Sequence, residues 1–115
     1  MRIETVFINL NANDFNGLSG WWARLLDRHW DREPMPTCRE WDLREGVLFQ
    51  VLDNPGQTAP GTVTLRIANL DHRIAVLRDA GLTIPDPVAV EGFDTLRFCQ
   101  FQDPEGNVVG LLEGE

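Results

Sequence analysis

The sequence contains no lysine and no tyrosine, and all ten basic residues are arginine against 18 acidic residues, which gives a formal net charge of −8. A nucleic-acid-binding face needs clustered positive charge to displace the counterions of the phosphates. This composition therefore argues against a nucleic-acid partner. The missing tyrosine removes one type of catalytic acid or base, and the surplus of negative charge favours a cationic ligand over an anionic one.

Long apolar runs and clustered cysteines are also missing. No window reaches the roughly 18 apolar residues of a membrane span, and MRIETVFINL lacks the cationic segment and long apolar run of a secretory signal. The two cysteines, Cys38 and Cys99, lie far apart and form no CxxC pattern. We expect a cytoplasmic protein with two reduced thiols and no membrane partner.

What the chain does contain is enough apolar material for one domain. It has 115 residues, of which 43% are hydrophobic, too few for two domains with separate cores. RIETVFINL alternates as a strand does, and NANDFNGLSGWWARLLD follows with Asn13 and Asp14 as candidate helix caps. Trp21 and Trp22 are neighbours on this helix, so we expect one in the core and the other at a partner surface or the edge of the cavity. Two strand-like segments follow, around 38–43 and 47–52.

The second half repeats this order. TVTLRIANL alternates, NLDHRIAVLRDAG is typical of a helix with Asn69 as its N-cap and Gly81 at its end, and strands are expected around 84–90, 95–102 and 108–112. Both halves read as strand, helix, then two or three strands. The sequence therefore predicts a duplicated βαβββ unit, residues 1–57 and 61–115, within a single domain 1–115.

Four stretches in this order support a family resemblance: NDFNGLSGWWARLLD, GVLFQVLDNPG, ANLDHRIAVLRDAG and FQDPEGN. With them the chain resembles the vicinal oxygen chelate superfamily, which includes glyoxalases, extradiol dioxygenases and bleomycin-resistance proteins. The resemblance covers essentially the whole chain. It implies an α+β fold in which two tandem βαβββ modules form an incomplete barrel, or cup, with the helices outside. It also implies a homodimer.

The same resemblance locates the metal positions of the family's enzymes, and this chain departs from the pattern at all three. Phe7 stands where His is usual, Thr62 where His or Gln is usual, and Gly110 where Glu is usual. Shifting the alignment by two residues gives Asn9, Thr64 and Leu112, which is no better. A divalent cation needs about three ligands with N, O or S lone pairs. We therefore expect no metal and no cofactor.

Aromatic residues are the main indication of a ligand. Phe7, Trp41, Phe49 and Phe98 would line the cup if their strands face as expected, although aromatic side chains are more often core. Arg66 shares a strand face with Thr62 and Thr64, and either a structural ion pair or a ligand anchor would explain it. The predicted ligand-binding residues are Phe7, Asn9, Trp41, Phe49, Thr62, Thr64, Arg66, Phe98, Gln100 and Gly110.

The remaining polar groups identify no catalytic residue. His29 is expected at the end of the first helix or at the rim, and His72 on a solvent-facing turn of the second helix. Glu40 and Asp42 alternate with Arg39, Trp41 and Leu43, which predicts one charged and one apolar face for that strand. Glu113 would project near the mouth of the cup if the last strand alternates. Without knowledge of burial, none of these carboxylates can be assigned as a general base.

Three functions remain open. The first is a metal-free protein of the bleomycin-resistance type that sequesters a hydrophobic or aromatic ligand, which the net charge would favour if it were cationic. The second is an enzyme of the same fold, such as a lyase, isomerase or dioxygenase-like protein, with a non-standard site that uses Arg66 or recruits metal through His29 or Glu113. The third is a structural or interaction module whose cup is filled by its own side chains.

Overall fold

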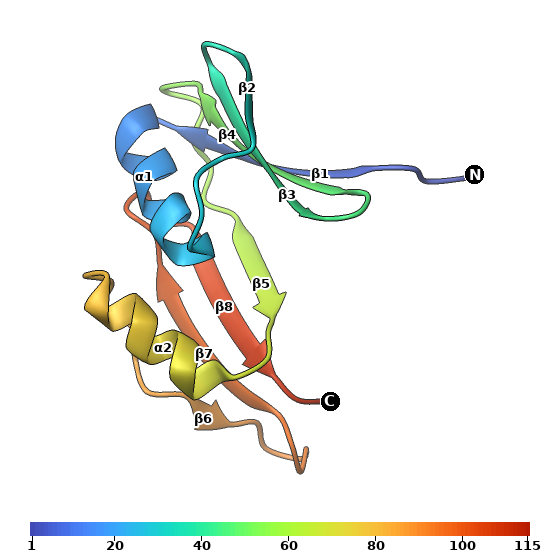
Figure 1. Cartoon of the computed structure of the whole chain (residues 1–115), viewed down its shortest axis with the longest axis vertical. Helices are drawn as coiled ribbons and strands as arrows, with labels where there is room; N and C mark the ends of the chain where they lie inside the picture. The colour runs from blue at the N-terminus through green and yellow to red at the C-terminus, as the bar shows by residue number, and fades with distance from the viewer. The chain divides into compact units, whose positions relative to one another are not determined.

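The computed structural model describes residues 1–115 and has an α+β fold built from two helices and two four-stranded mixed sheets (Figure 1). The chain divides into two compact units, Met1–Ala59 and Pro60–Glu115. Each unit runs strand, helix, strand, strand, strand, as the duplicated βαβββ pattern predicts. Neither sheet closes on itself as a barrel.

The first unit places its helix over one face of a sheet with strand order β1-β4-β3-β2. Strand β1 pairs with β4 in parallel, and the β3–β4 and β2–β3 pairs are antiparallel. This arrangement makes β4 a central strand and leaves β1 and β2 as the edges. The elements are β1 (Val6–Ala12), α1 (Phe15–Leu26), β2 (Arg32–Met35), β3 (Cys38–Arg44) and β4 (Val47–Asp53).

Helix α1 begins at a side-chain cap and ends in a left-handed residue. The carboxylate of Asp14 accepts a hydrogen bond from the Gly17 amide at 3.0 Å, and Asp27 closes the helix with φ of 56°. Trp22 packs on Phe49 of the sheet, with 4.4 Å between ring centroids. Trp21 and Trp22 are both buried, at 9% and 1% exposure, so neither side chain is open to solvent. The apolar face of this helix is wide enough to bury two residues that are adjacent in sequence.

The second unit has the same arrangement, with strand order β5-β8-β7-β6. Strand β5 pairs with β8 in parallel, and β7 pairs with both β8 and β6 in antiparallel fashion. The core lies between the sheet and α2, where Leu70, Ile74 and Leu77 are buried. The elements are β5 (Thr62–Arg66), α2 (Leu70–Asp79), β6 (Val88–Ala89), β7 (Arg97–Gln102) and β8 (Val108–Glu113).

Helix α2 is capped by a residue of β8 rather than by its own N-cap side chain. Asn69 occupies the N-cap position as predicted, but its backbone is left-handed, with φ of 58°, and its side chain makes no capping hydrogen bond. The amide of Leu70 instead donates to the Glu113 carboxylate at 2.7 Å. A carboxylate at a helix N-terminus is favourable because it meets unpaired N–H groups and the positive end of the dipole. Glu113 therefore has a structural role.

The DPEGN turn between β7 and β8 is held by side chains. The Asp103 carboxylate accepts hydrogen bonds from the amides of Glu105 and Asn107 and from the Asn107 side chain. The side-chain Oδ1 of Asn107 accepts a hydrogen bond from the Gly61 amide at 2.9 Å, which ties the turn to the residue before β5. Asp103 and Asn107 are 6% and 4% exposed, so these bonds form largely away from water.

Neither helix has both the length and the apolar composition that crossing a bilayer would require.

Candidate functional site: the helix-free faces of the two sheets

Each sheet has one face covered by its helix and one that is not, and the second is the candidate site. Successive side chains of a strand point to opposite faces, so the strand registers assign each residue to one of them. In the first unit we call the uncovered side the first open face. Its residues are Phe7, Asn9 and Asn11 on β1, Leu48, Gln50 and Leu52 on β4, Cys38, Glu40 and Asp42 on β3, and Arg32 on β2.

Trp41 and Phe49 are not on this face, which corrects the prediction that they line the ligand-binding surface. Both are 0% exposed. The Phe49 ring contacts Trp22 of α1 and Trp41 of β3, and the Trp41 indole N–H donates to the Arg28 carbonyl at 3.0 Å. Burying a large aromatic side chain stabilises the fold by roughly 1.5–3 kcal/mol, which accounts for their place under the helix.

A row of polar side chains crosses the first open face, one from each strand. Asn9 pairs with Gln50, Gln50 with Glu40, and Glu40 with Arg32. The Gln50 amide nitrogen donates to one Glu40 oxygen at 2.7 Å, and Arg32 Nε donates to the other at 2.8 Å. Glu40 is only 7% exposed. A buried carboxylate with a donor on each oxygen is a preorganised group.

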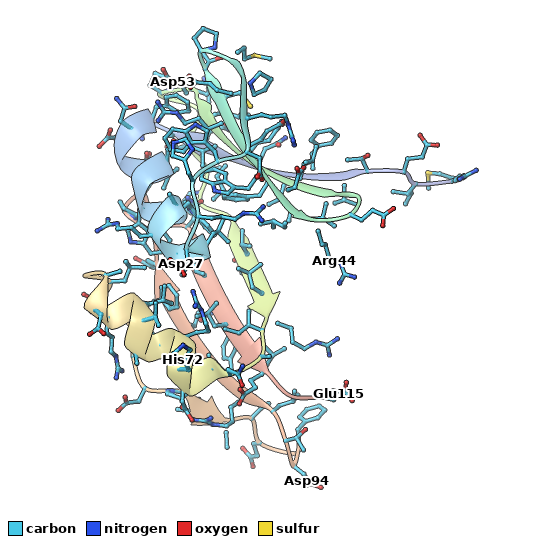
Figure 2. The ribbon with its side chains drawn as sticks, viewed as in Figure 1. Asp27, Arg44, Asp53, His72, Asp94 and Glu115 are labelled. Carbon is cyan, nitrogen blue, oxygen red and sulfur yellow. The ribbon has the colours of Figure 1, made fainter.

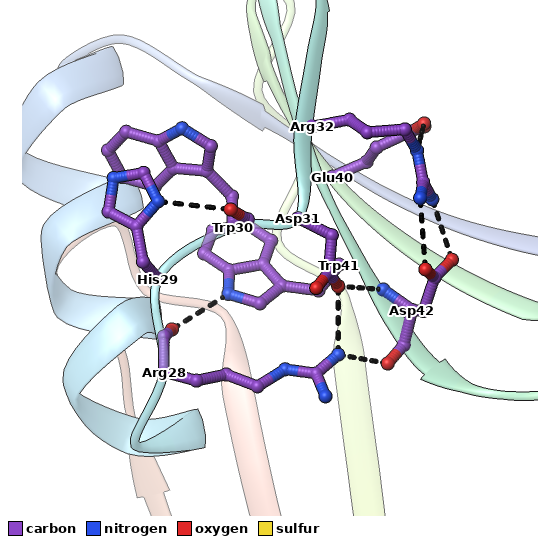
Figure 3. A network of polar contacts seen from close by, with 8 residues as sticks. All are labelled: Arg28, His29, Trp30, Asp31, Arg32, Glu40, Trp41 and Asp42. Carbon is purple, nitrogen blue, oxygen red and sulfur yellow. Dashed lines mark hydrogen bonds and ion pairs between the residues drawn. The ribbon is translucent and has the colours of Figure 1, made fainter.

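The hydrogen bonds of this row keep Glu40 ionised, and Figure 3 shows Arg32 between Glu40 and Asp42. The hydrogen bond from Arg32, and then that from Gln50, hold the pKa of the Glu40 carboxyl below its usual range, although burial opposes them. Arg32 also binds Asp42 at 2.6 Å and lowers the pKa of that carboxyl, while Asp42 and Glu40 raise the pKa of the guanidinium. One cation thus faces two anions.

The loop between α1 and β2 supports this network. Asp31 accepts a hydrogen bond from the Asp42 amide at 2.6 Å and forms an ion pair with Arg28 at 2.9 Å, and Arg28 also donates to the Asp42 carbonyl (Figure 3). His29 lies in the same loop, exposed, with its ring 3.7 Å from that of Trp30 and its Nδ1 3.0 Å from the Trp30 carbonyl. His29 therefore lies at a helix end, and His72 is exposed on α2 (Figure 2).

The second unit has an equivalent uncovered side, which we call the second open face. The rows across it follow the registers of β5, β8 and β7, and Thr64, Gly110 and Gln100 form one of them. All of the predicted ligand-binding residues of this unit lie here. The face consists of Thr62, Thr64 and Arg66 on β5, Val108, Gly110 and Leu112 on β8, and Phe98, Gln100 and Gln102 on β7.

At the centre of the second open face, Phe98 covers Gly110. A Cβ atom placed on Gly110 would lie 2.8 Å from Cε2 of the Phe98 ring and 3.1 Å from the Thr64 hydroxyl oxygen. Cβ atoms do not approach other heavy atoms this closely, so any larger residue at position 110 requires Phe98 to move. Gly110 is thus paired with an aromatic ring that uses the space its missing side chain leaves.

Arg66 is exposed on the same face and makes no side-chain hydrogen bond or ion pair within its unit. The structural ion pair considered from the sequence is therefore not formed there. Among the other arginines of this unit, Arg97 binds Asp71 at 2.8 Å and Glu113 at 3.5 Å, and Arg78 binds Asp86 at 2.9 Å. Arg66 is left as a solvated cation.

The residues at the three metal positions implied by the family resemblance do not suit a divalent cation. Phe7 is an apolar side chain with 54% exposure, Thr62 offers one neutral hydroxyl, and at Gly110 the space of a side chain is taken by Phe98. The structure brings no three His, Cys, Asp or Glu side chains together as a ligand group. Metal coordination needs lone pairs in a fixed geometry, so no step of a mechanism is assigned to a metal here.

Sequence reasoning missed Gln50, Glu40 and Arg32 as members of the candidate site. The internal duplication contained the necessary signal: Phe7 and Thr62 are equivalent, and the residues two positions later, Asn9 and Thr64, pair with Gln50 and Gly110. Gln50 is therefore the counterpart of Gly110 in the first unit. Register is not readable from one sequence without this equivalence.

Comparison with solved structures identifies the fold. The glyoxalase/bleomycin resistance protein from Catenulispora acidiphila DSM 44928 is similar with a TM-score of 0.84 and 22% identity, covering 96% of this chain and 98% of that one. A bleomycin-binding protein complexed with bleomycin gives 0.72 and 18%, with 96% and 98% coverage. A lactoylglutathione lyase from Agrobacterium tumefaciens gives 0.73 and 13%, with 95% and 92% coverage.

The chain has the fold of these glyoxalase and bleomycin-resistance proteins. No protein-family model and no curated protein sequence matches it. Both a binding protein and an enzyme have this fold, so the fold alone does not define the function.

Proposed function

We propose that the chain is a metal-free binding protein that sequesters a small hydrophobic or aromatic molecule on the helix-free faces of its sheets. The observation that carries this proposal is the Phe98 ring over Gly110. An aromatic ring there occupies the space into which the metal-binding Glu of the family's enzymes would project. The bleomycin-binding protein of the same fold supports it. Phe7 adds an exposed aromatic ring on the first open face.

The polar groups favour binding over acid–base catalysis. Glu40 is the buried carboxylate of the first open face, and its lowered pKa makes it a weak base and a poor proton donor near neutral pH. Aromatic rings beside fixed hydrogen-bonding groups are instead typical of ligand sites. We propose that the protein acts in the cytoplasm as a homodimer, and its acidity would speed the capture of a cationic guest.

The proposal is tested by native mass spectrometry of the gently purified protein and by titration with two probes, metal-free bleomycin and the aromatic cation 9-aminoacridine. We expect a metal-free dimer and a saturable complex with at least one probe. Phe98→Ala should weaken that complex about tenfold, since an aromatic contact is lost. Phe93→Ala is the matched control, because Phe93 is 58% exposed outside the second open face.

Two results would contradict the proposal. One is the absence of a saturable complex with either probe and of any retained organic molecule in the mass spectrum. The other is an equal loss of affinity in Phe98→Ala and Phe93→Ala, which would show that the ligand does not bind at the second open face. Circular dichroism of both variants checks that they are folded.

A further inference from the structure

The orientation of the Gln50 side chain is set by its neighbour. Glu40 is a carboxylate and can only accept hydrogen bonds, so Gln50 must turn its amide nitrogen toward it, as the 2.7 Å bond shows. The Gln50 carbonyl oxygen consequently points away from Glu40. It accepts no hydrogen bond in the structure, and Gln50 is half-buried on β4.

The surroundings of that oxygen combine apolar area with unused polar capacity. Phe7 is 54% exposed, and Leu48 and Leu52, two positions to either side of Gln50 on β4, are half-buried. Asn9 is the cross-strand neighbour of Gln50, is exposed, and makes no side-chain hydrogen bond. A flat apolar molecule lying on this face would meet one fixed acceptor.

Charge on this face favours a particular kind of hydrogen-bonding group. Arg32 is shared between Glu40 and Asp42, so the cluster has one more negative than positive charge. An acceptor whose N–H group is bound to a carboxylate also becomes more electron-rich, because hydrogen bonds in a chain polarise one another. Both effects favour a donor, and a positively charged donor most.

We propose that Gln50, oriented by Glu40, is the polar anchor that selects ligands carrying an N–H donor next to an aromatic ring that lies on Phe7. This inference rests on the proposed binding function and specifies its ligand class: an aromatic amine or ammonium, or an aromatic carboxamide. Glu40 is a positioning residue, since it acts through Gln50. Arg32 holds Glu40 in turn.

The test uses three acridines that share one ring system: 9-aminoacridine, a cation with N–H donors; acridine-9-carboxamide, neutral with N–H donors; and acridine-9-carboxylate, an anion without them. The wild-type chain should bind the first most tightly, the second less tightly and the third most weakly. Gln50→Leu, of similar size but without an acceptor, should weaken the two N–H probes about tenfold and leave the carboxylate unchanged.

Glu40→Gln provides a result that a purely structural role would not give. Residue 40 would then accept from Arg32 and donate to the Gln50 oxygen, so Gln50 would turn its N–H₂ group to the ligand. The preference between 9-aminoacridine and acridine-9-carboxylate should shrink or reverse. In the wild type, 9-aminoacridine should also shift the NMR signals of the Gln50 side-chain amide.

The outcomes separate this inference from the proposed function. If the wild type binds the acridines and neither variant changes the order of affinities, the binding function stands and the role of Gln50 is overturned. If the wild type binds none of the three and retains no other aromatic molecule, the proposed function itself fails. Asn107→Ala, which alters a turn of the second unit, controls for a general loss of stability.

Discussion

Glu40 keeps its negative charge in a largely buried position because donors meet both of its oxygens. Arg32 and Gln50 supply them from the two strands that flank β3. Leaving such a carboxylate without donors would be strongly unfavourable. Its neighbour Cys38 is affected as well, because burial, and then the charge of Glu40, raise the pKa of that thiol. The charged and titratable side chains of the first open face are thus coupled to one another.

This coupling predicts how Glu40→Gln changes stability with pH. A carboxyl whose pKa is lowered in the folded state stabilises the fold above its unfolded pKa, and the contribution is lost as the pH falls through the folded pKa. At pH 7 the substitution should reduce the free energy of unfolding by about 1–2 kcal/mol, since charge-assisted hydrogen bonds become neutral ones. The difference should shrink below about pH 4.5. Urea denaturation at several pH values measures it.

Glu45→Gln is the control, because Glu45 is exposed in the β3–β4 turn and makes no ion pair or hydrogen bond with its side chain. That variant should follow the wild type at every pH. A Glu40→Gln deficit that stays constant down to acid pH would show that packing, and not charge, is what the substitution removes.

At the scale of elements, the β7–β8 turn shows that a sequence motif can have a structural role even where no metal-binding residue follows it. The DPEGN stretch contributed to the family resemblance, and in the structure its Asp103 and Asn107 side chains bond to each other at 2.8 Å and to nearby amides. The Asn107 bond to Gly61 fixes where β5 begins beside β8. The motif positions the strands, whereas the size of the residue three positions after it, Gly110, is limited by its contact with Phe98.

We therefore expect Asn107→Ala to destabilise the protein by about 2–3 kcal/mol, because it leaves buried hydrogen-bonding groups without their partner. Thermal or urea unfolding measures this loss. Gln102→Ala, at the exposed end of β7, should change stability much less. Equal effects of the two substitutions would mean that the turn is held by its backbone alone.

The elements and the duplication were readable from the sequence, because capped amphipathic helices and alternating strands leave local patterns. The facing of β3 and β4 was not. Alternation assigns Trp41 and Glu40 to opposite faces but does not say which face the helix covers. The prediction that Trp41 and Phe49 face the ligand therefore put two large apolar side chains on the wrong face of the sheet. Both are buried in the core beneath Trp22 instead. The Glu113 cap was likewise hidden, since it depends on the contact of β8 with α2.

At the scale of the molecule, each of the two units buries apolar side chains between its own helix and sheet, yet each contains fewer than sixty residues. Domains of this size bury a smaller fraction of their surface than larger domains do and are marginally stable alone. We expect the chain to unfold as the single domain that its length suggests, with one transition. The alternative is two transitions, one for each unit.

The distribution of probes along the chain makes this testable, because all four tryptophans, at positions 21, 22, 30 and 41, lie in the first unit and Cys99 lies in the second. In Cys38→Ala, Cys99 is the only thiol and is 3% exposed, so its reaction with a thiol reagent reports the opening of the second unit. Tryptophan fluorescence reports the first unit in the same sample.

Under one transition, the urea midpoints of the two signals coincide. In the matched variant Cys99→Ala, Cys38 and the tryptophans report the same unit and must coincide in either case. Reaction of Cys99 at lower urea than the fluorescence change, with coincidence retained for Cys38, would establish that the units unfold independently.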